Sequence, residues 1–260
     1  MFFSEENKTN SKKFIVIIPK KFMGIIKNKS NNLRASICVL FSGGKDSTAA
    51  VFELSKNYKI ACLITIVSEN PDSFMFHTPN INLTELQAKA MKIPLIKFAT
   101  KGKKEKELSD LKAAIKLAKD KYSIEAVGVG ALESQYQLQR IEKICKELDL
   151  FVLAPFWKKN IEKYMNYLLD NSFEIIFTGV AAEGFDKSWL RRKLDKNALE
   201  DLKKLNKHYK IHLAGEGGEY ETFVLNCLLF KKKIKILDYD KILNKNSGKL
   251  VINQVELVKK

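Results

Sequence analysis

The chain has 260 residues, 45% of them hydrophobic, so it can bury one large core or two smaller ones. Its formal net charge is +16, with 46 Lys and Arg residues spread over its length. The composition excludes intrinsic disorder for most of the chain, while the charge does not choose between a phosphate-rich ligand, an acidic protein and RNA as partner. No apolar run in the sequence reaches the roughly 20 residues that span a bilayer, so we expect a cytoplasmic protein with no membrane partner.

The first 35 residues differ from the rest of the chain. They begin with the polar stretch SEENKTNSKK and end with KNKSNNLRAS, which is typical of a linker. The apolar segment between these stretches, FIVIIPKKFMGII, fits an added strand, an added helix or a dispensable extension. We treat residues 1–35 as an N-terminal extension and expect the chemistry not to need it.

From Ser36 the sequence alternates between strand and helix patterns. In chain order we expect a strand at 36–41, a helix at 47–56, a strand at 59–67, a helix at 82–93, a strand at 94–100, a helix at 104–122, a strand at 124–130 and a helix at 134–148. This alternation predicts a parallel sheet with helices on both faces. Ligands of such sheets bind at the carboxyl ends of the strands.

A second region is expected to begin at residue 149. FVLAPFW and FEIIFTGV read as strands, with a helix over 158–171 between them, and the chain after residue 212 becomes β-like and basic. We therefore divide the chain into a parallel-sheet α/β domain at 36–148 and a smaller α+β subdomain at 149–260.

The four cysteines do not form a metal or redox motif. They are far apart in the sequence, contain no CxxC pair, and two of them stand in apolar runs (Cys38, Cys62, Cys145 and Cys227). Reduced thiols buried in the core are the expected state.

The segment SGGKDS, residues 42–47, follows the first expected strand and precedes a helix. Gly43 and Gly44 let the backbone approach an anion, and the helix start adds its positive dipole. The hydroxyls of Ser42 and Ser47 and the ammonium of Lys45 would hold phosphate. Asp46 does not suit a pure anion site unless it holds Mg²⁺ or a proton, since carboxylate and phosphate together are usual ligands of that ion. The spacing matches neither a Walker A loop nor G-x-G-x-x-G.

SGGKDS resembles the pyrophosphate loop, or PP-loop, of the N-type ATP pyrophosphatases. Members of that superfamily include GMP synthetase, NAD synthetase, lysidine synthetase and tRNA sulfur-transfer enzymes. The resemblance implies an adenine-nucleotide α-hydrolase-like fold, which is a Rossmann-like (HUP) architecture, and cleavage of ATP to AMP and pyrophosphate. It does not name the acceptor.

Three further stretches carry residues suited to binding or proton transfer. MFHTPN places His77 and Asn80 on the loop after the second strand. AAEGFDKSWL places Glu183 at the end of a later strand. GEGGEYETF places three carboxylates around Gly217-Gly218, at Glu216, Glu219 and Glu221. Carboxylates this close repel one another unless they meet a metal, a cation or hydrogen-bond donors.

These stretches, in this order, resemble the diphthine–ammonia ligase family, also called diphthamide synthetase. The resemblance spans about residues 36–237 and departs from the family pattern at Arg191, where that pattern has Gly after WL, and in the N-terminal extension. It implies a ligase that uses ATP and ammonium to amidate diphthine, a modified histidine of translation elongation factor 2. Nucleic acid would then be met only through the factor or the ribosome. The sequence does not indicate an oligomeric state.

The resemblance also implies roles for individual residues. Ser42, Gly43, Gly44, Lys45, Asp46, Ser47 and Thr65 would bind ATP, with Lys45 and Asp46 also catalytic and Asp46 the ligand of Mg²⁺. His77, Asn80 and Glu216 would bind substrate. Glu219 and Glu221, and after them Glu183, are the candidates to bind ammonium and accept its proton.

Two other functions stay open from the residues. A PP-loop enzyme that modifies tRNA through an adenylated intermediate fits the positive charge, but the paired cysteines of sulfur transfer are missing from the sequence. A nucleotide-binding sensor without ligase activity fits the fold, but the intact Lys45 and Asp46 oppose it.

Overall fold

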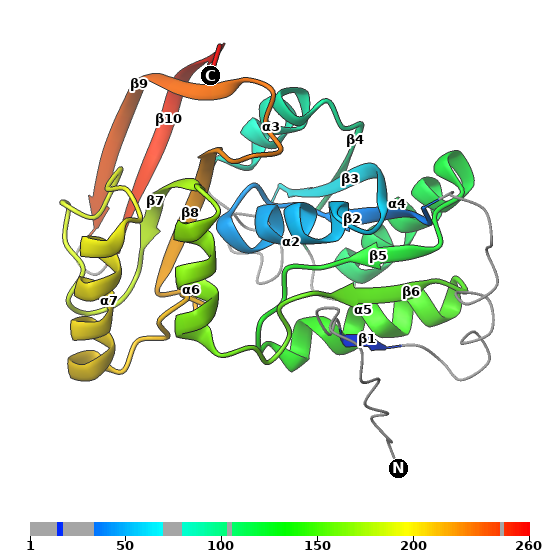
Figure 1. Ribbon diagram of the computed structural model, residues 1–260, viewed down its shortest axis with the longest axis horizontal. Helices are drawn as coiled ribbons and strands as arrows, with labels where there is room; N and C mark the ends of the chain where they lie inside the picture. Colours follow the sequence, from blue (N-terminus) through cyan, green and yellow to red (C-terminus); the bar gives the residue numbers. More distant parts are fainter. Residues whose placement is uncertain (1–14, 18–33, 70–79, 103–105, 245–246) are drawn as a thin grey trace.

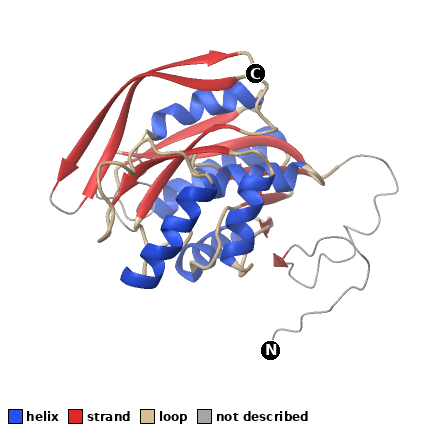
Figure 2. Cartoon of the chain, turned by 60° about the vertical axis from the view of Figure 1, so that its left-hand side comes forward, coloured by secondary structure: helices blue, strands red, loops and turns tan. Residues whose placement is uncertain are grey.

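The computed structural model describes residues 15–17, 34–69, 80–102, 106–244 and 247–260. These residues form two β-sheets with helices packed against them (Figure 1). The first sheet has the strand order β1-β6-β5-β2-β3-β4, and the second has the order β8-β7-β10-β9. In Figure 2 the long strands that lead to the C-terminus extend along the outer side of the molecule.

Five parallel strands make up most of the first sheet: β2 (Ser36–Leu40), β3 (Lys59–Ser68), β4 (Leu95–Thr100), β5 (Ala126–Gly128) and β6 (Phe151–Ala154). Side chains alternate along β2, so Ile37 and Val39 enter one apolar core while Cys38 enters the other. Parallel sheets need such burial on both faces. The α/β fold class predicted from the sequence is therefore confirmed.

Helices connect these strands and cover both faces of the sheet. They are α2 (Lys45–Ser55), the 3-10 turn η2 (Ile81–Leu83) with α3 (Thr84–Met91), α4 (Lys106–Tyr122) and α5 (Gln135–Glu147). Helices α4 and α5 bury Leu111 and Ile144 in one core, whereas α2 and α3 bury Val51 and Met91 in the other. Each expected helix between residues 36 and 148 is present, with its ends shifted by a few residues.

The direction of chain winding reverses next to β2. From this strand, β3 and β4 follow on one side of the sheet, while β5 and β6 lie on the other (Figure 1). The connections leaving the carboxyl ends of β2 and β5 therefore separate and open a crevice, which is where open α/β sheets bind ligands. The SGGKDS segment begins at this crevice.

The second sheet is antiparallel and consists of β7 (Glu174–Val180), β8 (Tyr220–Asn226), β9 (Lys233–Asn244) and β10 (Ser247–Val258). Helix α6 (Ile161–Asp170) precedes it, and α7 (Lys196–Tyr209) connects β7 to β8. No prediction was made for residues 196–209. Asp195 starts α7 by accepting the Ala198 N–H at 2.8 Å, a side-chain cap of the usual kind.

The two sheets share one apolar core. Val51 of α2, Met165 of α6 and Phe223 of β8 belong to the same buried cluster. The Val224 N–H also donates to the carbonyl of Gly43, at 3.1 Å, so a strand of the second sheet is bonded to the glycine turn of the first.

The strand at Phe151–Ala154 lies in a different place from the one expected. It was assigned to the second region, but it pairs in parallel with β5 and completes the first sheet. A short apolar run predicts a strand without naming its partner, which explains the difference. Strand β1 (Ile15–Ile17) of the N-terminal extension pairs antiparallel with β6. Apart from this strand and residues 34–35, the extension lies outside the described residues.

All four cysteines are free and buried, as predicted. Across the residues that the structure describes, no helix combines the length and the apolar character that a membrane span requires.

Arg191 has a left-handed backbone, with φ at 68°. Its N–H donates to the carbonyl of Phe177 at 2.9 Å, which fixes this conformation in the turn after β7. A left-handed backbone favours Gly, which is the residue that the family pattern has here. The Arg191 guanidinium lies 4.5 Å from the ring centre of Tyr239 on β9 and donates to its hydroxyl. This contact of the side chain stabilises the turn, whereas the left-handed backbone of Arg191 strains it.

This balance predicts the effect of two substitutions. Arg191→Gly relieves the strain and loses the Tyr239 contact, so the free energy of unfolding should change by less than about 1 kcal/mol. Arg191→Ala loses the same contact and keeps the strain, so it should be less stable than the Gly variant by about 1 kcal/mol. Urea denaturation of the three proteins measures both differences. A Gly variant no more stable than the Ala variant would contradict this account.

Candidate functional site

The glycine turn between β2 and α2 is shaped to leave its backbone open to a ligand. Gly43 has φ at 82°, and a Cβ at this position would collide with Oε1 of Gln87. Gln87 is fully buried on α3, and its amide nitrogen donates to the Gly43 carbonyl at 2.9 Å and to the Val224 carbonyl at 2.8 Å. The buried hydrogen bonds of Gln87 therefore fix the conformation of the turn.

Ser42 and Ser47 stand on either side of the turn. Their hydroxyl oxygens lie 3.3 Å apart, and the Ser47 hydroxyl also donates to the Gly44 carbonyl at 3.2 Å. Helix α2 begins at Lys45, so the first N–H groups of the helix are directed to the same place. Hydroxyls and a helix N-terminus together form a binding site for phosphate.

Gly130, which follows β5, brings the neighbouring loop against α2. A Cβ on Gly130 would lie 2.6 Å from the Asp46 carbonyl carbon and 2.7 Å from the Ser47 nitrogen. Only glycine permits this approach of two backbones, and it places the loop after β5 at the wall of the crevice.

Lys45 is almost completely buried, with 3% of its surface exposed. Its ammonium donates to Asp46 Oδ2 at 2.9 Å and to the Ala214 carbonyl at 2.5 Å, and it lies 5.2 Å from the ring centre of Tyr220. Its backbone N–H donates to Thr222 Oγ1 at 3.1 Å. The segment around GEGGEYETF therefore closes over the predicted phosphate loop.

Asp46 is fixed in a second direction by α6. The hydroxyl of Tyr164 donates to Asp46 Oδ1 at 2.7 Å. Burial and the Asp46 charge raise the pKa of Tyr164 well above its ordinary value, so the phenol stays protonated and keeps donating. The Asp46 side chain is still 32% exposed, which leaves it able to meet a ligand in the crevice.

A cavity of about 430 Å³ opens in this crevice. One end is lined by Ser42, Lys45, Asp46 and Ser47, and another part is apolar, with Ile64 of β3 among its lining residues. Residues 215–218 and 220–222 line it from the side of the second sheet. A polar end joined to an apolar slot fits a nucleotide with its phosphates at the loop.

The three carboxylates of GEGGEYETF have different environments. Glu216 accepts the N–H groups of Leu132 and Glu133 at 2.7 and 2.8 Å, and so ties its own loop to the loop after β5. Glu219 accepts the backbone N–H of His212 at 2.6 Å. Glu221 lines the cavity, and no described residue makes a hydrogen bond with its carboxylate.

The remaining predicted residues lie elsewhere or serve the fold. Thr65 is buried and donates to the Phe41 carbonyl at 2.7 Å, while the cavity is lined by its neighbours Ile64 and Ile66. Asn80 uses its amide to bond the backbone of β10, at Leu250 and Ile252. Glu183 is exposed and does not line the cavity, and His77 lies outside the described residues.

Three residues that the sequence analysis did not single out contribute to the site. Thr222 belongs to GEGGEYETF, so the motif itself gave a signal for it. Tyr164 stands in an ordinary amphipathic helix, and Gln87 in another, so the sequence around them gives no signal of contact with the loop. Only the packing of distant segments brings them together.

One group of side chains among the described residues is compact enough to suggest a metal: Glu133, His212 and Glu216. The Nδ1 atom of His212 accepts the N–H groups of Ala214 and Glu216, at 3.2 and 3.3 Å. In a neutral imidazole the proton then sits on Nε2, which faces Glu133 at 3.2 Å. Because Nε2 lacks a free lone pair in this arrangement, the group holds the loop and does not fit a metal.

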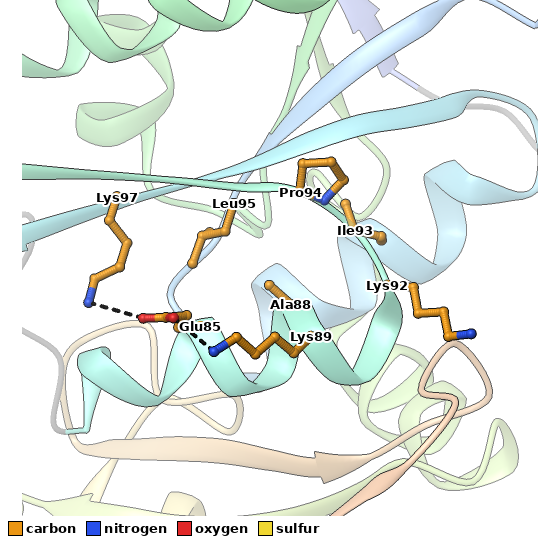
Figure 3. A pocket seen from close by; sticks show the side chains of 8 residues that line it. All are labelled: Glu85, Ala88, Lys89, Lys92, Ile93, Pro94, Leu95 and Lys97. Atoms are coloured by element: carbon orange, nitrogen blue, oxygen red, sulfur yellow. Dashed lines mark ion pairs between the residues drawn. The ribbon is translucent and has the colours of Figure 1, made fainter.

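A second hollow, of about 480 Å³, lies between α3 and β4 (Figure 3). Three of its charged groups are paired with each other: Glu85 meets the ammonium of Lys89 at 3.0 Å and that of Lys97 at 3.9 Å. Hydrogen bonding and charge from Lys89 lower the pKa of Glu85. The hollow contains none of the motif residues, so it is not the candidate site.

Comparison with known proteins agrees with this geometry. A family model described as the diphthamide synthase N-terminal domain matches residues 35–151, and one described as the diphthamide synthase C-terminal domain matches residues 160–258. The chain belongs to the diphthamide synthase family. The resemblance drawn from SGGKDS, MFHTPN, AEGFDKSWL and GEGGEYETFVL is thereby confirmed.

Several relatives of this chain share the name diphthine–ammonia ligase. Proteins named diphthine–ammonia ligase from Mus musculus and Homo sapiens are 36% and 35% identical to it, over 77% and 76% of this chain and 82% and 81% of their own. The protein of that name from Saccharomyces cerevisiae is 30% identical over 74% of this chain and 33% of its own length. A solved structure titled as a predicted subunit of tRNA methyltransferase from Methanocaldococcus jannaschii aligns with 75% of this chain at a TM-score of 0.41 and 19% identity.

The environment of Glu221 predicts a pH-dependent stability. Burial raises the pKa of Glu221 to about 7 from its ordinary 4.5, so the folded protein holds this proton more tightly than the unfolded chain does. Its contribution to stability is present below pH 4.5 and is lost as the pH rises through 7. Glu221→Gln should therefore raise the free energy of unfolding by about 2 kcal/mol at pH 8 and by much less at pH 5. Urea denaturation at both values tests this, and an equal effect at both would contradict it.

Proposed function

We propose that this chain catalyses the ATP-dependent amidation of diphthine on translation elongation factor 2 with ammonium, giving diphthamide, AMP and pyrophosphate. This is the last step of diphthamide biosynthesis. The observation that carries the proposal is the SGGKDS turn at the reversal of strand order, opening into a cavity that GEGGEYETF closes. Membership of the diphthamide synthase family and relatives named diphthine–ammonia ligase support it.

ATP would bind in one orientation, set by the polar and apolar parts of the cavity. Its phosphates would lie at residues 42–47, where the hydroxyls of Ser42 and Ser47 and the N-terminus of α2 converge. Its adenine would lie in the apolar part, next to Ile64 and Ile66. Thr65 would contribute through the backbone of β3, because its hydroxyl is used by the Phe41 carbonyl.

Lys45 and Asp46 would act on the departing pyrophosphate. The Lys45 ammonium is held in place before the reaction and can neutralise the charge that develops on the leaving oxygens. Asp46 is a carboxylate with an exposed edge beside the phosphate loop, which fits a ligand of Mg²⁺. The ion would supply further charge neutralisation on the phosphates.

The reaction would take two steps in the one cavity. The diphthine carboxylate attacks the α-phosphorus of ATP, pyrophosphate leaves, and an acyl-adenylate forms. A nitrogen nucleophile then attacks the acyl carbon and AMP leaves. No cysteine of the chain is exposed, so a cysteine-dependent glutaminase step does not fit, and free ammonium is the expected nitrogen donor.

The partner is a folded protein, so the mouth of the cavity would receive its modified histidine. Glu216 lines the cavity and would meet the substrate there, and the roles predicted for Glu216 and His77 stay predictions. The factor works in the cytoplasm, which is where we place this enzyme. Nucleic acid would be met only through the factor or the ribosome. The alternative of a tRNA-modifying enzyme is not favoured, since the curated relatives share the diphthine–ammonia ligase name.

The products of the reaction test the proposal directly. Incubation of the purified chain with ATP, ammonium and diphthine-bearing elongation factor 2 should give AMP and pyrophosphate, because the loop is of the SGGKDS kind and not a Walker loop. Chromatography separates AMP from ADP, and mass spectrometry of the factor detects the amide. ADP as main product, or AMP formed equally without the factor, would refute the proposal.

Removing the Lys45 ammonium should slow the reaction strongly. Lys45→Ala is expected to lower the rate by about 100-fold or more, since one preorganised charge at the leaving group is lost. Lys89→Ala is the matched control, because Lys89 lies in the hollow of Figure 3 and is paired with Glu85. Steady-state pyrophosphate release measures both variants. Full activity of Lys45→Ala would place the phosphate site elsewhere.

A further inference from the structure

Glu221 packs against a glycine of the neighbouring strand. It lies on β8 opposite Gly179 of β7, in the register of the second sheet. A Cβ on Gly179 would come within 3.1 Å of the Glu221 Cβ and 3.4 Å of its Cγ. Because Gly179 has no side chain, the stem of Glu221 packs across it, and the rest of the side chain reaches the wall of the nucleotide cavity.

The Glu221 side chain is only partly buried where it lines the cavity, and no residue that the structure describes donates a hydrogen bond to its carboxylate. Its two neighbours in the motif differ in this respect. Glu216 accepts two backbone N–H groups. Glu219 accepts one from His212 on Oε1, its Oε2 is buried without a partner among the described residues, and its side chain does not line the cavity. A partly buried carboxylate that no described donor occupies keeps its acceptor capacity for a proton or a cation that enters the cavity.

The charges around Glu221 belong to the reaction centre. Lys45 attracts the carboxylate and Asp46 repels it, and burial has a larger effect than either, so the pKa of Glu221 rises to about 7. Lys45 is already bound to Asp46 and to the Ala214 carbonyl, so it does not form an ion pair with Glu221. The site therefore keeps an unpaired acceptor beside the place where the phosphate chain is cleaved.

We propose that the Glu221 carboxylate is the binding site for ammonium and accepts the first proton that ammonium loses. This inference rests on the proposed function and names the residue that prepares its second substrate. A small cation with several N–H donors matches a carboxylate that lacks donors and lines a cavity. Glu219 and Glu183, the other candidates from the sequence, do not line the cavity, and Glu183 is exposed.

The step balances as follows in atoms and electrons. Ammonium transfers one proton to Glu221, which becomes a carboxylic acid, and neutral ammonia remains beside it. The nitrogen lone pair forms the C–N bond to the acyl carbon of the adenylate. The bond between that carbon and the phosphate oxygen breaks, and AMP leaves with the electron pair. The nitrogen then releases a second proton to water and the amide is complete.

The test uses Glu221→Gln, which keeps the shape of the side chain and removes its charge and basicity. We expect kcat/KM for ammonium to fall by about 100-fold or more, because both the binding of the cation and the proton transfer are lost. Glu174→Gln is the matched control: Glu174 lies on β7, away from the cavity, and accepts a hydrogen bond from Asn226 of β8. It should keep the wild-type dependence on ammonium.

Two further measurements separate this role from a structural one. Exchange of labelled pyrophosphate into ATP, measured with diphthine-bearing factor and without ammonium, reports adenylation and should be nearly unchanged in Glu221→Gln. Hydroxylamine is a neutral nucleophile at neutral pH and needs neither a cation site nor a base to free its lone pair. Its hydroxamate product should therefore form at a similar rate with the variant and the wild type.

The outcomes distinguish the alternatives. If adenylation by Glu221→Gln falls with the amidation rate and its Mg²⁺ requirement rises, Glu221 is a metal or phosphate residue and the inference is overturned. If the ammonium dependence of the variant equals that of the wild type, the inference is likewise overturned while the proposed function stands. If wild-type protein fails to amidate the factor with ammonium in these assays, the proposed function itself fails.

Discussion

The arrangement of the candidate site depends on the buried ammonium of Lys45, whose oxygen partners come from both halves of the chain. Lys45 is 3% exposed and is bonded to Asp46 beside it and to the carbonyl of Ala214, far along the sequence. A buried charge without partners is too costly to keep, so the segment at 211–222 has to lie against the glycine turn. Tyr164 and Thr222 stabilise the same contact, and the cavity exists because of it. Neither half of the chain would form this site alone.

The features that the sequence predicted are the local ones. A strand followed by Ser-Gly-Gly and a helix start determines where N–H groups converge, so this turn could be predicted from six consecutive residues, while its binding of phosphate stays a prediction. Alternation of apolar runs and amphipathic segments gave the parallel sheet, because Ile37 and Val39 must face one core while Cys38 faces the other. These signals need no knowledge of distant contacts.

The features that the sequence missed depend on pairing across long separations. Glu219 and Glu221 are two residues apart and read alike, but the register with Gly179 directs one toward the cavity, and the His212 N–H binds the other. The side chains of Thr65 and Asn80 bond backbone groups, at Phe41 and in β10, and the sequence gives no sign of these contacts; the predicted roles of the two residues in binding stay predictions. The strand at 151–154 joined the first sheet for the same kind of reason, since a partner is chosen by the whole fold.

The outer strand of the second sheet has a consequence for how the protein behaves in concentrated solution. Strand β9 is twelve residues long, lies at the edge of its sheet, and exposes Leu237, Ile242 and Leu243. Such an edge is a template for adding a strand from another chain, which leads to aggregation. Lysines along β9, at positions 233, 235 and 241, would have to be desolvated in that process. Part of the chain's large positive charge thus opposes the addition of strands from other chains to the β9 edge.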